Sequence, residues 1–182
     1  MIMSVRIHSL LRFVTSISMI LLITGCAIAQ TGQDDKTKPA EGKKPAMALK
    51  AGPVDKLEKV SPGKIDADAS PEFLETKSGL KYRILRKSEE KKPTSADTVS
   101  VHYKGWLDDG TIFDSSYQRN EKISFPLGRV VKGWTQGLQL IGTGGMIELE
   151  IPYELGYGER GMPPTIPPKA TLHFVVELFS IK

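Results

Sequence analysis

Few side chains in this sequence have the types and spacing that covalent chemistry needs. His102 and Ser115 could be paired as base and nucleophile. However, His102 alternates with Ser100 and Lys104 along a predicted strand, so we expect it to point outward. The one cysteine, Cys26, cannot form an internal disulfide, and no Cys/His cluster has metal-ligand spacing. The residues therefore give no sign of a catalytic nucleophile, a metal or a cofactor.

The most informative apolar residue is Trp134, because it begins the stripe of a predicted helix over residues 130–140. Trp134, Leu138 and Ile141 recur at helical spacing and form one apolar face. A helix of about two turns is not stable alone in water, so it must lie against strands. Trp134 is then either a core anchor or the floor of an apolar pocket.

Alternating apolar and polar residues predict about five strands around this helix. The candidate segments are residues 80–85, 98–107, 111–114, 123–128, 146–151 and 171–179, with a hairpin turn at Asp109–Gly110. The predicted fold class is α+β, an antiparallel sheet with one short helix, in a domain spanning residues 75–182.

The charge distribution argues against nucleic-acid binding. The net charge is +4, divided between an excess of two positive charges in residues 1–30 and two in residues 78–182. Residues 31–77 are neutral overall. No basic block remains in the predicted mature chain, so we expect no nucleic-acid partner.

The first 26 residues have the layout of a secretory signal. A short basic stretch with Arg6 and Arg12 precedes an apolar run from 13 to 23, too short for a comfortable membrane span. The run ends in residues 22–26 (LITGC), which resemble a bacterial lipobox, so lipidation is expected at Cys26. Cleavage after Ala29 would instead release a soluble protein, and an uncleaved anchor is the third alternative. Each alternative places the rest of the chain outside the cytoplasm.

Residues 27–74 are rich in Lys, Asp, Glu, Ala, Gly and Pro and contain few large apolar residues. Such a composition cannot bury enough surface to offset chain entropy. We therefore expect a disordered or flexible tether that carries the domain clear of a membrane.

A set of short motifs, in order and in one register, resembles the FKBP-type peptidyl-prolyl cis-trans isomerases. They are residues 99–105 (VSVHYKG), 109–110 (DG), 113–116 (FDSS), 127–128 (LG), 133–134 (GW), 157–158 (YG) and 166–174 (IPPKATLHF). Residues 78–82 (SGLKY) resemble the start of bacterial members. Each motif alone is weak, but their shared order over about residues 75–182 is specific. The resemblance implies a twisted antiparallel sheet wrapped around one short helix.

The resemblance also implies an apolar trough between helix and sheet that needs no cofactor or metal. Its implied catalytic residues are Tyr103, Phe113, Asp114, Tyr157 and Phe174. Its implied substrate-binding residues are Ile123, Phe125, Val130, Val131, Trp134 and Ile166. Trp134 would be the floor, and Val131 N–H and the Tyr157 hydroxyl would bind substrate carbonyls. Asp114 would act on the twisted amide, or brace the loop through Tyr103 and Arg119.

By this resemblance the protein is a prolyl isomerase that assists the folding of exported proteins. The implied partners are proline-containing polypeptides and macrolide inhibitors. The alternative is a tethered module that binds proline peptides without essential turnover. Two residues depart from the family pattern, Ile123 from an aromatic residue and Met162 from a histidine. No long dimerising helix precedes the domain, so a monomer is expected.

Overall fold

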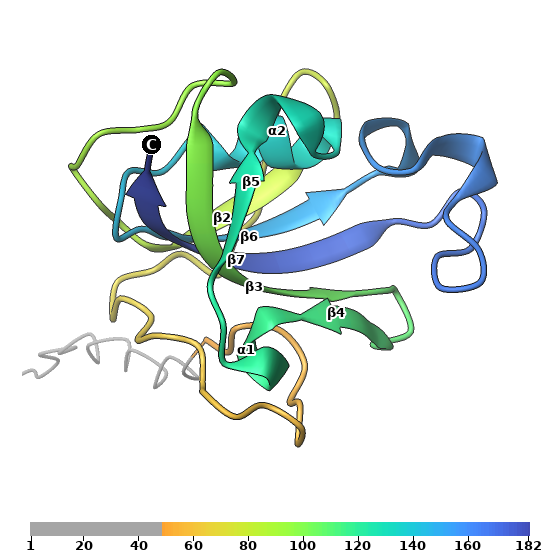
Figure 1. Cartoon of the computed structure of the whole chain (residues 1–182), viewed down its shortest axis with the longest axis horizontal. Helices are drawn as coiled ribbons and strands as arrows, with labels where there is room; N and C mark the ends of the chain where they lie inside the picture. The colour runs from red at the N-terminus through yellow and green to blue at the C-terminus, as the bar shows by residue number, and fades with distance from the viewer. Residues whose placement is uncertain (1–48) are drawn as a thin grey trace, which may run out of the picture. The chain divides into compact units, whose positions relative to one another are not determined.

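The computed structural model describes residues 49–182, which contain a seven-stranded antiparallel β-sheet (Figure 1). The strands are β1 (Leu74–Glu75), β2 (Lys81–Arg86), β3 (Thr98–Trp106), β4 (Ile112–Ser115), β5 (Ile123–Pro126), β6 (Met146–Ile151) and β7 (Leu172–Ile181). Their order is β1-β2-β6-β7-β3-β4, and β5 pairs with the first half of β3. The α+β prediction is confirmed, with seven strands instead of about five. The two-residue β1 is too short to show any alternation in the sequence.

The predicted helix is α2 (Lys132–Leu138), somewhat shorter than residues 130–140. It packs unusually close to β6. A Cβ on Gly133 would lie 2.5 Å from Ile151 Cγ2, and a Cβ on Gly137 would lie 2.6 Å from Leu149 Cδ2. These two glycines therefore allow the helix backbone to approach the sheet.

Shorter helical segments connect the strands. They are α1 (Ser116–Arg119) and the 3₁₀ turns η1 (Leu127–Arg129), η2 (Tyr153–Leu155) and η3 (Gly158–Arg160). The sequence shows no helical pattern where α1 lies, because four residues are too few for helical periodicity. α1 joins β4 to β5, which pair with opposite halves of β3.

The sheet has two buried faces. Val101 and Tyr103 of β3 belong to the main core beneath α2, together with Ile147 of β6. On the other face, Leu85, Trp106, Met146 and Val175 form a second apolar cluster. Alternation along each strand supplies both faces.

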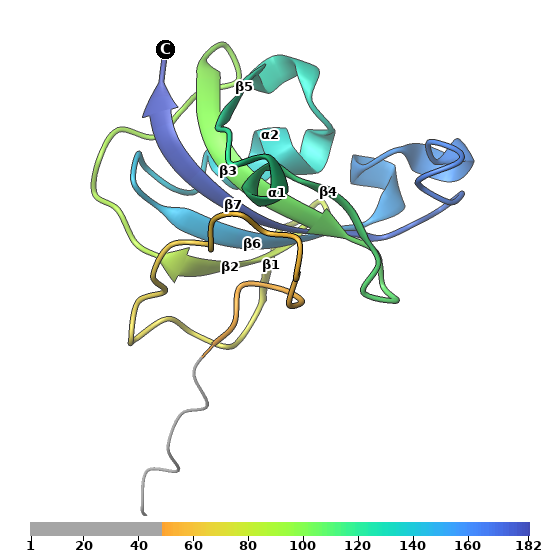
Figure 2. The ribbon, with the colours of Figure 1, turned by 60° about the horizontal axis from the view of Figure 1, so that its bottom comes forward.

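The second face is covered by residues 49–66, here called the strap. Figures 1 and 2 show this segment, in orange to yellow, on the side of the sheet opposite α2. Ala51 and Ile65 pack on the second cluster. Asp66 N–H donates to Leu85 O at 2.8 Å, which fixes the end of the strap beside β2.

The prediction of a flexible tether over residues 27–74 is therefore corrected for residues 49–66. Composition shows too little apolar surface, but the strap is held by specific polar contacts, which composition does not reveal. The prediction that His102 points outward is corrected as well. It faces away from α2, yet only 8% of its surface is exposed, because the second face is covered.

The predicted signal segment, Cys26 and residues 27–48 lie outside the described residues. Within residues 49–182, no helix has the length and apolarity needed to cross a membrane.

Candidate active site

The centre of the site is an aromatic cluster around Trp134 of α2. Its indole makes edge-to-face contacts with Phe174 at 5.2 Å, Tyr103 at 5.3 Å and Phe125 at 5.6 Å between ring centroids. These rings come from β7, β3 and β5, so three strands converge on one helical residue. Edge-to-face packing is the arrangement that aromatic quadrupoles favour. Only 4% of the Trp134 surface is exposed.

Trp134 is nevertheless not fully satisfied by its surroundings. Within residues 49–182, its indole N–H is buried and has no hydrogen-bond partner. A buried unpaired donor costs free energy, and native proteins contain few of them. Among the described residues, the aromatic cluster therefore contains a donor that the fold itself does not satisfy.

Phe113 of β4 extends the cluster toward solvent by packing edge-to-face on Phe174 at 5.5 Å. Gly105 of β3 makes this contact possible. A Cβ at Gly105 would lie 2.6 Å from both the Phe113 and the Phe174 ring. The sequence places Gly105 in a motif but does not include it among the site residues, because its role is the space that it leaves.

The remaining apolar site residues surround this cluster. Ile166 is buried within it, and Ile123, Val130 and Val131 are partly buried against it. The structure thus brings together nine of the eleven predicted trough residues in one apolar group; the exceptions are the polar Asp114 and Tyr157.

Asp114 is the polar end of the site. Its carboxylate accepts a hydrogen bond from the Tyr103 hydroxyl. It also forms an ion pair with Arg119, whose Nη1 lies 2.7 Å from Asp114 Oδ1. Arg119 Nη2 also lies 3.2 Å from the Tyr103 hydroxyl oxygen. Burial, and then the hydrogen bond and charge of Asp114, raise the pKa of Tyr103. The bracing contacts predicted for Asp114 are therefore present.

Tyr157 precedes η3 and is 39% exposed. Partial burial raises the pKa of its hydroxyl, and the charge of Asp114 raises it further. The two groups are thus close enough to interact electrostatically. Tyr157 and Asp114 form a polar rim beside the aromatic cluster.

His102 and Ser115 do not form a nucleophile and base. His102 Nδ1 lies 2.9 Å from the Oγ of the next residue, Ser116, which also accepts Tyr103 N–H at 2.8 Å. Ser116 is fully buried, and burial lowers the pKa of His102. These contacts fix α1 to β3. Within residues 49–182, no three His, Cys, Asp or Glu residues are grouped to hold a metal ion.

Comparison with known sequences and structures agrees with this arrangement. The sequence profile described as FKBP-type peptidyl-prolyl cis-trans isomerase matches residues 89–179. The FKBP-type 22 kDa peptidyl-prolyl cis-trans isomerase of Escherichia coli is 49% identical over 106 residues, covering 58% of this chain and 52% of the relative. A probable FKBP-type isomerase of Haemophilus influenzae is 48% identical, covering 58% of this chain and 44% of the relative.

Solved structures give the same result. The crystal structure of FkpA from Escherichia coli matches 62% of this chain and 53% of its own, with a TM-score of 0.60 and 46% identity. The crystal structure of AtFKBP13 matches 61% of this chain and 99% of its own, with a TM-score of 0.56 and 35% identity. The chain spans about half the length of the curated relatives that it matches. On the profile match and these identities, the chain belongs to the FKBP-type peptidyl-prolyl cis-trans isomerase family.

Proposed function

We propose that the domain catalyses cis-trans isomerisation of X-Pro peptide bonds at the aromatic cluster. The observation that carries this proposal is the group of three rings around Trp134, whose indole N–H is buried and has no partner within residues 49–182. Such a surface accommodates a proline ring by area and shape. Trp134, Phe113 and Phe174 would hold the ring.

The chemistry asks for no nucleophile. An X-Pro amide rotates across a barrier of about 18–20 kcal/mol, which arises from amide resonance. Water strengthens that resonance by hydrogen-bonding the carbonyl, so an apolar site favours the twisted and less charge-separated transition state. Only interactions that are stronger in this transition state raise the rate, and each 1.36 kcal/mol gives about a tenfold increase.

Polar groups at the edge of the cluster would orient the peptide. Val131 precedes α2, and the first N–H groups of a helix have no intrahelical partner. Its N–H is therefore suited to donate to a substrate carbonyl, as is the Tyr157 hydroxyl on the rim. Asp114 would contribute its negative charge near the twisted amide while bracing Tyr103 and Arg119.

Two aliphatic side chains also bear on substrate choice. Ile123 is partly buried at the cluster, and Met162 is 44% exposed on the loop before Ile166. Ile123 and Met162 would contact the residue before proline and the body of a macrolide inhibitor.

We further propose that the protein is exported and anchored by lipid at Cys26, where it assists the folding of exported proteins as a monomer. The support is the lipobox-like sequence LITGC after a short apolar run. Mass measurement of the mature N-terminus tests the anchor: a chain that begins at Gln30 contradicts it. Sedimentation equilibrium tests the monomer.

A protease-coupled assay on a short X-Pro peptide tests the isomerase. The folded domain should accelerate the slow phase of cleavage in proportion to its concentration. No acceleration by folded protein that still binds the peptide would instead identify a binding module without turnover.

A further inference from the structure

The polar end of the site depends on the position of α1. Asp114 and Ser115 end β4, and α1 begins at the next residue. Its last residue, Arg119, contacts both Asp114 and the Tyr103 hydroxyl. A shift of α1 therefore changes the contacts of Asp114 directly.

α1 cannot fix its own position. It has four residues and no side-chain cap at its N-terminus, and a single helical turn is unstable without tertiary contacts. Two of the contacts that hold it come from the strap. Lys59 N–H donates to Tyr117 O at 3.1 Å, and Gln118 Nε2 donates to Asp55 Oδ2 at 2.8 Å.

A third connection runs through a buried carboxylate, Glu177 of β7. Its Oε1 accepts both the Tyr117 hydroxyl at 2.7 Å and the strap N–H of Gly63 at 2.8 Å. Arg86 Nη2 lies 2.9 Å from Oε2. Burial alone would raise the pKa of Glu177, but these three donors together lower it. One ionised group thus holds both the strap and α1.

The strap is also attached to the strand that carries Tyr103. The next residue of β3, Lys104, is 2% exposed and donates to Pro53 O at 2.8 Å and to Glu58 Oε1 at 2.9 Å. A buried cation that loses its partners is strongly destabilising, so this attachment is firm.

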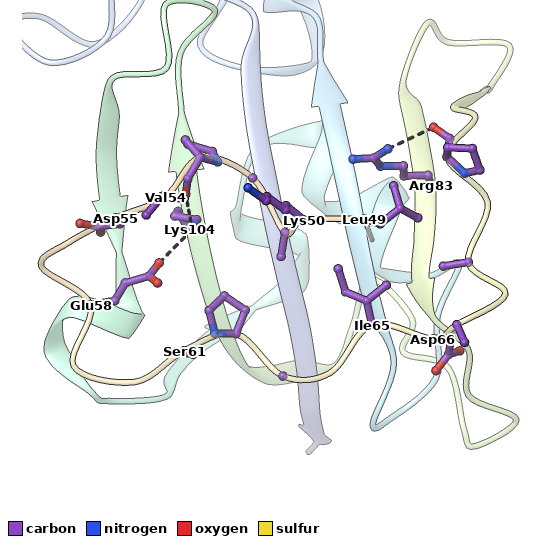
Figure 3. A pocket seen from close by; sticks show the side chains of 18 residues that line it. Leu49, Lys50, Val54, Asp55, Glu58, Ser61, Ile65, Asp66, Arg83 and Lys104 are labelled. Atoms are coloured by element: carbon purple, nitrogen blue, oxygen red, sulfur yellow. Dashed lines mark hydrogen bonds and ion pairs between the residues drawn. The ribbon is translucent and has the colours of Figure 1, made fainter. Parts of the chain in front are cut away.

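Between these attachments the strap does not follow the sheet closely. A cavity of about 1370 Å³ lies between them, and Figure 3 shows Lys104 and Arg83 among the residues around it. Arg83 bonds Pro71 O at 3.1 Å on the side away from Lys104. The strap is therefore held at separate points, so a single substitution can displace it at one point without removing a large apolar surface.

We propose that the strap is a positioning element for the proline site. By holding α1 through Lys59, Asp55 and the Glu177 carboxylate, it keeps Arg119 in contact with Asp114 and Tyr103. This inference rests on the proposed isomerase function. The aromatic cluster lies on the other face of the sheet, so the strap acts on the polar end of the site and not on the rings.

Gly63→Ala is the sharpest perturbation. A Cβ there would lie 2.4 Å from Glu177 Oε2 and 2.5 Å from Arg86 Nη1, so either these side chains or the strap must shift, and the contact between Gly63 and Glu177 is disturbed. Gly79→Ala is the matched control. It adds the same methyl group at a strained φ of +86°, and its nearest neighbour is Pro152 at 3.8 Å. Gln118→Ala, which removes only the bond to Asp55, is the milder second variant.

Isomerisation and amide hydrogen exchange are measured on the full chain at a temperature where each variant is folded. Gly63→Ala should lower kcat about tenfold with little change in KM, because displaced groups lose transition-state contacts while the ring site stays intact. Exchange at residues 116–119 should become faster. Gln118→Ala should show smaller changes of the same kind, and it carries the test if Gly63→Ala does not fold.

Gly79→Ala should leave kcat and α1 exchange unchanged. Equal losses of kcat in Gly63→Ala and Gly79→Ala would overturn the proposal, as would unchanged kcat in a Gly63→Ala protein whose strap amides exchange rapidly. An inactive wild type would count against the isomerase function instead. The same variants are then compared by their affinity for a proline peptide: Gly63→Ala should keep the wild-type Kd, and a Kd that weakens as much as kcat falls overturns the positioning role.

Discussion

Replacing Trp134 with leucine should separate its structural role from its role in binding. The substitution removes three edge-to-face pairs, each worth about 0.5–1.5 kcal/mol. It also leaves a cavity that costs about 1 kcal/mol more. Against these losses, it removes a buried unpaired N–H, which returns about 1–3 kcal/mol. The net loss of unfolding free energy should therefore be about 2 kcal/mol.

Peptide binding should weaken as well. The leucine side chain cannot offer a flat ring to proline, and a loss of about 1.4 kcal/mol corresponds to a tenfold weaker Kd. Urea denaturation measures the first quantity, and titration calorimetry with a proline peptide measures the second. Because Trp134 is one of two tryptophans, denaturation is followed by circular dichroism instead of fluorescence.

Leu138→Ala is the matched control on the same helix. Leu138 is fully buried in the main core, so its truncation should cost about 2–5 kcal/mol of unfolding free energy. It should leave the Kd of the folded protein unchanged. Leu138→Ala should therefore lose more unfolding free energy than Trp134→Leu, whereas Trp134→Leu should lose more peptide affinity. If Trp134→Leu binds the peptide as tightly as Leu138→Ala does, Trp134 is only a core anchor and our interpretation of its unpaired N–H is wrong.

Three other substitutions test the remaining parts of the site and its support. Gly105→Ala should destabilise the domain by about 1–3 kcal/mol and abolish most isomerisation, because its Cβ would meet Phe113 and Phe174 at 2.6 Å; unchanged kcat/KM would show that these rings need no such gap. Asp114→Asn should lower kcat about tenfold and, since the charge is lost, lower the pKa of Tyr157 in a spectrophotometric titration. Glu177 has a pKa below its ordinary value of 4.5, so it stabilises the fold fully above pH 4.5, and that stability is lost as pH falls through the folded pKa. Glu177→Gln should therefore flatten the dependence of unfolding free energy on pH below 4.5, and an unchanged slope there would contradict the ionised state.

Local periodicity in the sequence predicts the sheet and α2, whereas the residues of the aromatic cluster are implied by the resemblance to the family. Trp134 and Leu138 show the helical stripe, and Val99, Val101 and Tyr103 show the strand alternation directly. The position of Gly105 at the end of a motif is also visible, but its function is not. That function depends on the distance between rings from two strands, which only the fold determines.

The sequence does not reveal the strap, because its contacts join residues that are distant in the chain and leave no local pattern. Gly63 and Glu177 are 114 residues apart in the chain, and their contact joins a backbone N–H to a carboxylate. Neither group produces an apolar pattern. Residues 49–66 have the polar composition that is typical of disorder, yet they are ordered by a few buried polar contacts. Composition reports how much apolar surface a segment can bury, and it does not report how many of its polar groups find buried partners.

The apolar contacts of the cluster and the polar contacts of the strap both involve β3. This explains how the strap can affect the site from the opposite face. Tyr103 faces the cluster and bonds Asp114, while its neighbours His102 and Lys104 face the strap side. Ser116 joins the two sides, because its Oγ lies within hydrogen-bond distance of His102 Nδ1 and also accepts Tyr103 N–H. A strand with both faces buried cannot move one row of side chains without moving the other. The strap, whose sequence resembles a linker, therefore supports the proposed proline site from the opposite face of the sheet.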